Sequence, residues 1–189
     1  MKKLLYTFLA VSIIFSACEE DTTLPAANNN SALAIGDTHQ GGIIFYLDGN
    51  GGGLISSPSD QGVAEWGCYL TLISGADGTA IGTGSQNTID IEVGCATPGT
   101  AADLCANLTL GGYSDWFLPS EDELNEMYLN IGQGNALGLG NIGGFVNTYY
   151  WSSTEVDNLQ AWGQVFGNGN QGGSNKNYYG SIVRAVRAF

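Results

Sequence analysis

Short strand-like runs lie at both ends of the chain, with two helix signals between them. Residues 42–47 and 54–56 are apolar runs separated by a turn rich in glycine, which predicts a β-hairpin. Similar runs at 149–152, 161–166 and 181–189 predict strands near the C-terminus. Strands that flank helices in this order are typical of an α+β domain whose ends lie close together.

The first predicted helix covers residues 101–108. Thr100 can cap its N-terminus, and Gly111 can end it. The preceding residues, 74–100, are rich in Gly, Thr, Ser and Asp and contain only one short apolar stretch. We expect them to form a long ordered loop.

The second predicted helix begins with a capping box formed by Ser120 and Glu123. Apolar side chains then recur at helical spacing, which places four residues on one face: Leu124, Met127, Tyr128 and Ile131. The acidic first turn suits the positive end of the helix dipole. We therefore interpret the carboxylates of residues 121–123 as a helix start and not as catalytic groups.

The N-terminus has the pattern of an export signal. Two lysines precede an apolar run, and the small residues Ser16 and Ala17 end it, so residues 1–17 are predicted to be a signal peptide that is too short to span a membrane. Cys18 follows directly, and this arrangement resembles the lipobox of bacterial lipoproteins, which implies lipidation of Cys18. The alternative is ordinary cleavage that leaves a free cysteine.

The residues after Cys18 are small and polar, so residues 18–34 are expected to form a flexible tether to a domain at 35–189. The acidic run of residues 19–21 resembles the tag that sends some lipoproteins to the outer surface. We thus expect an outer-membrane lipoprotein, exposed on the cell surface and attached to the membrane by its lipid alone.

Charge excludes one class of partner. The chain has 5 basic and 18 acidic residues, and its formal net charge is −13. Nucleic acid binding needs clustered Lys and Arg for phosphate contacts, so no nucleic acid partner is expected.

Three further cysteines follow Cys18, namely Cys68, Cys95 and Cys105. An exported chain is expected to form one disulfide and keep one thiol, and proximity in the sequence favours Cys95 with Cys105. Three scattered cysteines and the single His39 make a poor zinc site, and we expect no metal and no cofactor.

Several separated motifs resemble those of one family. They are residues 111–124 (GGYSDWFLPSEDEL), 150–155 (YWSSTE) and the ending 183–189 (VRAVRAF). In this order they resemble the C-terminal domain of bacterial collagen-like adhesins. The resemblance spans residues 35–189 and implies a C-type-lectin-like fold, distantly related to formylglycine-generating enzymes. Two helices, short antiparallel strands and a loop-rich binding face are implied.

The sequence departs from the active members of these related groups. It contains no Glu-Pro-Asn, Gln-Pro-Asp or Trp-Asn-Asp tripeptide, so calcium-dependent sugar binding is not expected. No cysteine follows Cys105, whereas formylglycine-generating enzymes use a reactive pair near the C-terminus. We therefore expect no catalytic residues. Trp116 and Trp151 are predicted to lie in the core, and at least one of Arg184 and Arg187 is expected to form an ion pair.

The segment 158–179 has the composition of a binding surface. It is rich in Asn, Gln, Tyr, Ser and Gly, as antibody loops are, and nearly uncharged. Period-two alternation places Gln160, Trp162, Gln164 and Phe166 on one strand face. The predicted ligand-binding residues are Asn158, Gln160, Trp162, Gln164, Asn168, Asn170, Asn175, Asn177, Tyr178 and Tyr179. The alternative is a polar surface hairpin without a ligand.

The position and composition of this segment also resemble the variable region of lectin-like receptors that retroelements diversify. Our principal hypothesis is a surface-displayed, adhesin-like or receptor-like module that binds a glycan or protein ligand on a cell surface. One alternative is an envelope carbohydrate-active enzyme that uses carboxylates such as Asp115 or Glu155. The other is a structural envelope lipoprotein without a ligand.

Overall fold

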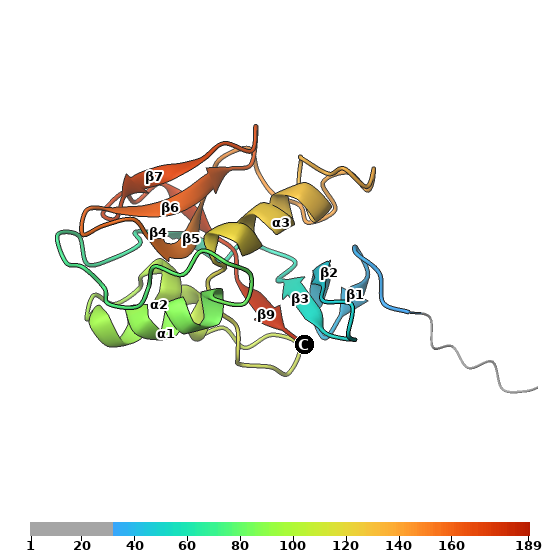
Figure 1. The fold of residues 1–189 in the computed structure, drawn as a ribbon, viewed down its shortest axis with the longest axis horizontal. Helices are drawn as coiled ribbons and strands as arrows, with labels where there is room; N and C mark the ends of the chain where they lie inside the picture. Colours follow the sequence, from blue (N-terminus) through green and yellow to red (C-terminus); the bar gives the residue numbers. More distant parts are fainter. Residues whose placement is uncertain (1–31) are drawn as a thin grey trace, which may run out of the picture. The chain divides into compact units, whose positions relative to one another are not determined.

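The computed structural model describes residues 32–189, and Leu33–Phe189 form a compact unit. The predicted signal peptide, the predicted lipidation site Cys18 and nearly all of the predicted tether lie outside the described residues. The described part has three helices and nine strands in two sheets, so the predicted α+β class is confirmed (Figure 1). Among residues 32–189, no helix combines the length and the apolar character that a membrane crossing requires.

The first sheet contains the predicted hairpin and the last strand. Its order is β1 (Thr38–His39), β2 (Gly42–Leu47), β3 (Gly53–Ser56) and β9 (Val186–Ala188), and all neighbours are antiparallel. Ile55 of β3 lies opposite Arg187 of β9, so the two ends of the domain meet in one sheet.

The second sheet has five strands in the order β4-β8-β5-β6-β7. Their bounds are β4 (Gly62–Ala64), β8 (Ser181–Val183), β5 (Tyr149–Glu155), β6 (Gln160–Val165) and β7 (Gln171–Asn175). Only β5 and β8 are parallel. The single strand expected over 181–189 is therefore divided between the sheets, and the break falls at Arg184, whose guanidinium donates to Ser57 O and Gly143 O.

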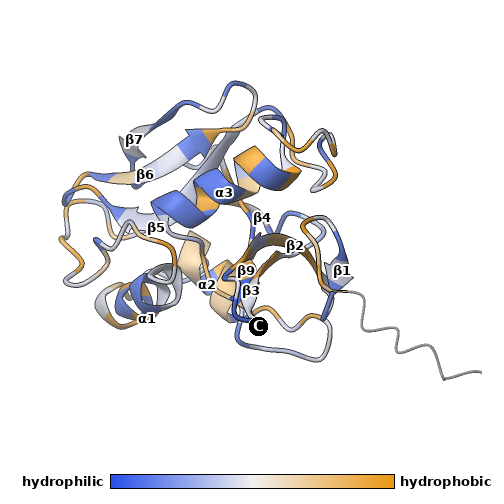
Figure 2. Cartoon of the chain, turned by 45° about the vertical axis from the view of Figure 1, so that its right-hand side comes forward, coloured by the Kyte–Doolittle hydropathy of each residue, from blue (hydrophilic) through white to orange (hydrophobic). Residues whose placement is uncertain are grey.

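Two of the three helices agree with their capping signals. In α2 (Ala101–Ala106), Thr100 Oγ1 accepts from Asp103 N at 3.2 Å. In α3 (Glu121–Ile131), the buried Glu123 carboxylate accepts from Ser120 N at 2.8 Å. Figure 2 shows hydrophilic and hydrophobic residues alternating along α3, as its predicted apolar face requires.

The third helix, α1 (Gly84–Gly94), contradicts the loop expected over 74–100. Its buried side carries Asn87 and Thr88 instead of an apolar stripe, so the periodicity that indicates a helix is missing. Thr88 Oγ1 donates to Gly84 O and accepts from Leu118 N. A side chain at Gly84 would lie 2.2 Å from the Glu123 carboxylate, so glycine allows α1 to approach α3 closely.

The β5 strand lies between two apolar clusters. Trp151 packs into one cluster with Trp66 and Trp116, and Tyr150 packs into the other with Phe166. The predicted core positions of Trp116 and Trp151 are confirmed, because 2% and 0% of their surfaces are exposed.

The expected disulfide is wrong. Cys95 pairs with Cys68, and Cys105 is a buried free thiol on α2. Proximity in the sequence favoured Cys105, but α2 turns that residue into the core, where nothing of its surface is exposed. The observed bridge joins the end of α1 to the segment after β4.

Candidate ligand-binding surface

The predicted binding residues follow the β6–β7 hairpin and fall into two groups. Gln160 lies opposite Asn175, whereas Gln164 lies opposite Gln171 near the turn. Six residues therefore gather at the open end of the hairpin, namely Asn158, Gln160, Asn175, Asn177, Tyr178 and Tyr179. Asn168 and Asn170 lie at the opposite end, in the turn, so the ten predicted residues do not form one patch.

Gln164 is not part of an exposed surface. Its side chain is fully buried, and its Nε2 donates to Asn125 Oδ1 on α3 at 2.9 Å and to Gly169 O at 3.1 Å. Alternation places it on the same strand face as Trp162, but α3 covers that part of the face. Gln164 is therefore a contact between sheet and helix.

The exposed remainder of this face forms what we call the amide face. It consists of Gln160, Trp162, Gln171, Gly173 and Asn175. Trp162 of β6 lies directly opposite Gly173 of β7 and is half-buried. Because Gly173 has no side chain, nothing on the neighbouring strand covers the indole from that position.

Trp162 differs from the other three tryptophans in its hydrogen bonding. The indole N–H groups of Trp66, Trp116 and Trp151 donate to the carbonyls of Ser152, Leu110 and Ala64 at 2.9, 3.3 and 3.0 Å. The indole N–H of Trp162 has no acceptor among residues 32–189. It is free to donate to a ligand.

An apolar group adjoins the open end of the hairpin. Leu70, Leu72, Tyr178 and Tyr179 have 64%, 67%, 53% and 67% of their surfaces exposed. Leu70 N donates to Asn158 O at 2.8 Å, which joins the segment after Cys68 to the β5–β6 turn. We call these four residues, together with Val156 and Asn158, the rim.

Sequence reasoning missed the Leu70–Leu72 part of the rim. One signal was available: residues 68–72 (CYLTL) carry three large apolar side chains in a segment assigned to no strand or helix. The structure adds a second, because Leu70 has a φ of 73°, which is unusual for a residue with a bulky side chain. Such strain is concentrated at functional segments.

A buried ion pair holds the rim in place. Lys176 is fully buried, forms an ion pair with Glu155 and donates to Thr71 O at 2.8 Å. Its ammonium also lies 4.6 Å from the centre of the Trp66 ring. The Glu155 carboxylate accepts from Ile73 N at 2.9 Å. One pair of side chains therefore fixes the 69–73 segment against β5 and the residue after β7.

All three cations of the described part of the chain are used internally. Lys176 pairs with Glu155, Arg184 with Asp60, and Arg187 with Asp115, so both candidate arginines form ion pairs. The hydrogen bond from Arg187 lowers the pKa of Asp115. Residues 32–189 contain fifteen Asp and Glu residues, and twelve of them have no cationic partner. The surface is strongly acidic.

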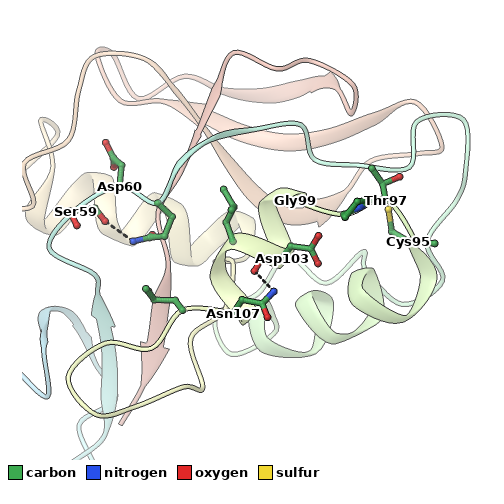
Figure 3. A pocket seen from close by; sticks show the side chains of 12 residues that line it. Ser59, Asp60, Cys95, Thr97, Gly99, Asp103 and Asn107 are labelled. Atoms are coloured by element: carbon green, nitrogen blue, oxygen red, sulfur yellow. Dashed lines mark hydrogen bonds between the residues drawn. The ribbon is translucent and has the colours of Figure 1, made fainter.

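A separate open groove of about 810 Å³ lies between the β3–β4 connection and α2 (Figure 3). Its lining includes Asp60, Thr97, Asp103 and Asn107, with the Cys68–Cys95 disulfide at one end. Asp103 is also a neighbour of Glu92, and partial burial together with Asp103 raises the pKa of Glu92 to about 7. The polar groups of the groove are largely engaged: Asp60 pairs with Arg184, and Asp103 caps α2.

Comparison with known proteins identifies the family. The model of the Lcl C-terminal domain matches residues 61–187, which is more than half of the chain. A search of curated proteins gave no match. The family match confirms the resemblance to the C-terminal domain of collagen-like adhesins and supports an adhesin-like module outside the cytoplasm or in the envelope. The chain belongs to the Lcl C-terminal domain family.

Proposed function

We propose that this protein is a lipid-anchored, surface-displayed binding module that recognises a protein or glycan through the amide face and the rim. The observation that carries the proposal is Trp162, the half-exposed tryptophan whose indole N–H has no acceptor in the described chain. Tryptophan and tyrosine dominate binding energy at interfaces because they combine a large apolar area with a polar group. The exposed Tyr178 and Tyr179 extend the same surface.

The scaffold suits this role. Both ends of the domain pair in one sheet, and the helices pack against the sheets, whereas long connections surround the open end of the β6–β7 hairpin (Figure 1). This arrangement is compatible with the C-type-lectin-like fold that the motifs imply, with three helices in place of two. Side chains on rigid strands keep a binding geometry better than side chains on loops alone.

The enzymatic alternative has little support. Glu155 is buried, and its carboxylate is occupied by Lys176 and by the Ile73 amide. Asp115 pairs with Arg187 in the other sheet. We propose that neither carboxylate acts as an acid or base on a substrate and that the module performs no chemistry.

The diversification hypothesis also fits this surface. Asn158, Asn168, Asn170, Asn175 and Asn177 are all exposed, so changes there would leave the core intact. We propose that these positions vary between sibling genes. Sequencing the locus in several isolates tests this, because changes would then concentrate at the codons of these five exposed asparagines, whereas changes spread evenly over the domain would contradict it.

Replacing Trp162 and Tyr178 together with alanine is expected to weaken binding at least about 30-fold, since interface tryptophans and tyrosines typically contribute 2 kcal/mol or more. Residues 32–189 are first applied to glycan and cell-surface protein arrays, with and without a calcium chelator. The strongest hit is then titrated against both proteins. The hit is expected to survive chelation.

The control is Leu137→Ala. Leu137 lies in the connection after α3, and its side chain is about as exposed as that of Tyr178. This variant should leave affinity within about twofold. If the Trp162→Ala/Tyr178→Ala protein keeps its melting temperature and still binds the ligand fully, the binding site lies outside the amide face and the rim. Turnover of a polysaccharide that is lost in Glu155→Gln would instead support the enzyme.

A further inference from the structure

The β7 strand is the open edge of the five-stranded sheet. It pairs with β6 alone, and both ribbon views show it at the outside of the sheet (Figures 1 and 2). Lys176 N donates to Leu159 O, and Val165 N donates to Asn170 O, both at 2.9 Å. Antiparallel strands alternate between bonded and non-bonded positions. The backbone groups of Gln171, Gly173 and Asn175 therefore point away from β6.

These outward groups are nearly all unused. Asn175 O accepts from Tyr178 N within the following turn at 2.8 Å. No described residue bonds to the backbone N–H groups of Gln171, Gly173 and Asn175, or to the carbonyls of Gln171 and Gly173. Every second residue of β7 thus presents backbone groups that can bond to another strand.

The other sheet edges within residues 32–189 are either bonded to neighbouring segments or very short. At β4, Ala64 O accepts from the Trp151 indole and Glu65 O accepts from Ala101 N. At β9, Val186 exchanges two backbone bonds with Phe117, of 2.8 and 2.9 Å. The remaining edge strand, β1, has two residues.

The β7 edge lacks the features by which proteins prevent unwanted pairing. Such edges usually carry charged residues, proline or a bulge. Residues 171–175 (QGGSN) contain no charge and no proline, and their register with β6 is continuous over five pairs. An edge kept open in this way is typical of binding by strand addition.

Gly173 also makes Trp162 reachable from this edge. A residue added opposite Gly173 would lie about 9–10 Å from the β6 backbone, which is two strand spacings. Its side chain would point to the same face as that of Trp162. Gly173 has no side chain, and the space above it is bordered by Gln160 and Val156, since a Cβ there would lie 3.1 Å from Gln160 Oε1 and 3.4 Å from Val156 Cγ2. Because the Gln160 amide is the end of a flexible side chain, it can shift aside, and a long side chain of the added strand can then cross Gly173 and lie over the indole.

The acidic surface of the domain favours a basic partner segment over a second copy of the same domain. Two copies of this domain would each bring twelve carboxylates without cationic partners, so pairing of β7 with β7 of a second copy is opposed by repulsion. Gln171 Nε2 donates to Glu121 O, which places the acidic start of α3 beside the edge. An arginine or lysine that crosses Gly173 would gain both this acidic neighbourhood and a cation–π contact with Trp162.

We infer that β7 binds an extended segment of a partner protein by strand addition, and that the segment carries arginine or lysine opposite Gly173. This inference rests on the proposed function and names its partner class. Backbone bonding to Gln171, Gly173 and Asn175 would supply the pairing, and Trp162 would select the basic side chain.

The probe is a phage-displayed library of random 12-residue peptides, selected against residues 32–189. We expect enriched peptides rich in β-branched residues with a basic residue at a fixed position. Gly173→Pro removes an outward N–H and should weaken binding of the best peptide at least tenfold, because proline is tolerated at an edge but cannot donate. Gly173→Ala adds a Cβ at the same place, 3.1 Å from the flexible Gln160 amide, but keeps the N–H, so it is the matched control and should bind the peptide at least about threefold more tightly than Gly173→Pro does.

A second measurement uses the unchanged protein, so its result does not depend on whether the Gly173→Pro variant folds. Two N-methylated versions of the peptide are compared, one methylated at the odd-numbered residues and one at the even-numbered residues. Methylation of the residues whose N–H groups face β7 should abolish binding, whereas methylation of the other residues should leave binding unchanged. Three results would overturn the inference. The selection could enrich acidic peptides, the Gly173→Pro variant could bind the best peptide as tightly as the parent protein does, or both methylated peptides could bind as tightly as the unmodified one. If the array ligand still requires Trp162 and Tyr178 in that case, the proposed function stands without strand addition.

Discussion

Replacing Lys176 with methionine is expected to lower the free energy of unfolding by about 3–5 kcal/mol, because it leaves Glu155 as an unpaired charge in the interior. Both side chains of the pair are almost fully excluded from water, and Lys176 Nζ also bonds to Thr71 O. Urea denaturation of residues 32–189, followed by tryptophan fluorescence, measures the change.

Two variants make this prediction specific. The double variant Glu155→Gln/Lys176→Met removes both charges and should recover a large part of the loss, whereas an additive result would show that the two residues act independently. Asp115→Asn breaks a pair whose carboxylate side chain is 63% exposed, and it should cost less than about 1 kcal/mol. If Lys176→Met and Asp115→Asn lower the free energy of unfolding equally, burial does not make the Lys176–Glu155 pair more costly to break than the exposed pair.

Loss of the Cys68–Cys95 disulfide is the second large effect. The bridge joins residues 27 apart, and chain-entropy estimates for a loop of this length give about 3.5 kcal/mol. The double variant Cys68→Ala/Cys95→Ala should be destabilised by about this amount. Thermal denaturation of the variant and of the oxidised parent measures it.

Reductant supplies the control for the disulfide. Dithiothreitol should lower the stability of the parent to that of the double variant and should leave the variant unchanged, since Cys105 has no partner among the described residues. Peptide mapping under oxidising conditions is expected to find Cys68 joined to Cys95. A bridge between Cys95 and Cys105 would contradict the observed core position of Cys105.

The elements with local signals could be predicted from the sequence. Capping boxes at Thr100 and Ser120 and the glycine-rich turn after residue 47 depend only on neighbouring residues, and α2, α3 and the first hairpin formed as predicted. Helix α1 could not be predicted in this way, because Asn87 and Thr88 fill its buried side through bonds to distant residues such as Leu118. The division of the last strand at Arg184 likewise depends on Ser57 and Gly143, which are remote in sequence.

The candidate surface could be predicted only in part. Composition indicated segment 158–179, and strand alternation placed Trp162 beside the exposed hairpin. Alternation could not show that α3 covers Gln164, because that contact depends on how a helix 39 residues away in sequence packs. The contribution of Leu70 and Leu72 to the rim depends on the buried Lys176, and a lone lysine in a polar segment gives no sign of burial.

The most direct test of the binding surface is the ¹⁵N–¹H spectrum of the four tryptophan indoles in residues 32–189. Three indole N–H groups are bonded inside the domain and should exchange slowly with water, whereas that of Trp162 should exchange fastest. Addition of the strongest array ligand is expected to shift the Trp162 signal most and to slow its exchange. A ligand that binds while the Trp162 signal stays unchanged would contradict the amide face as the site of recognition.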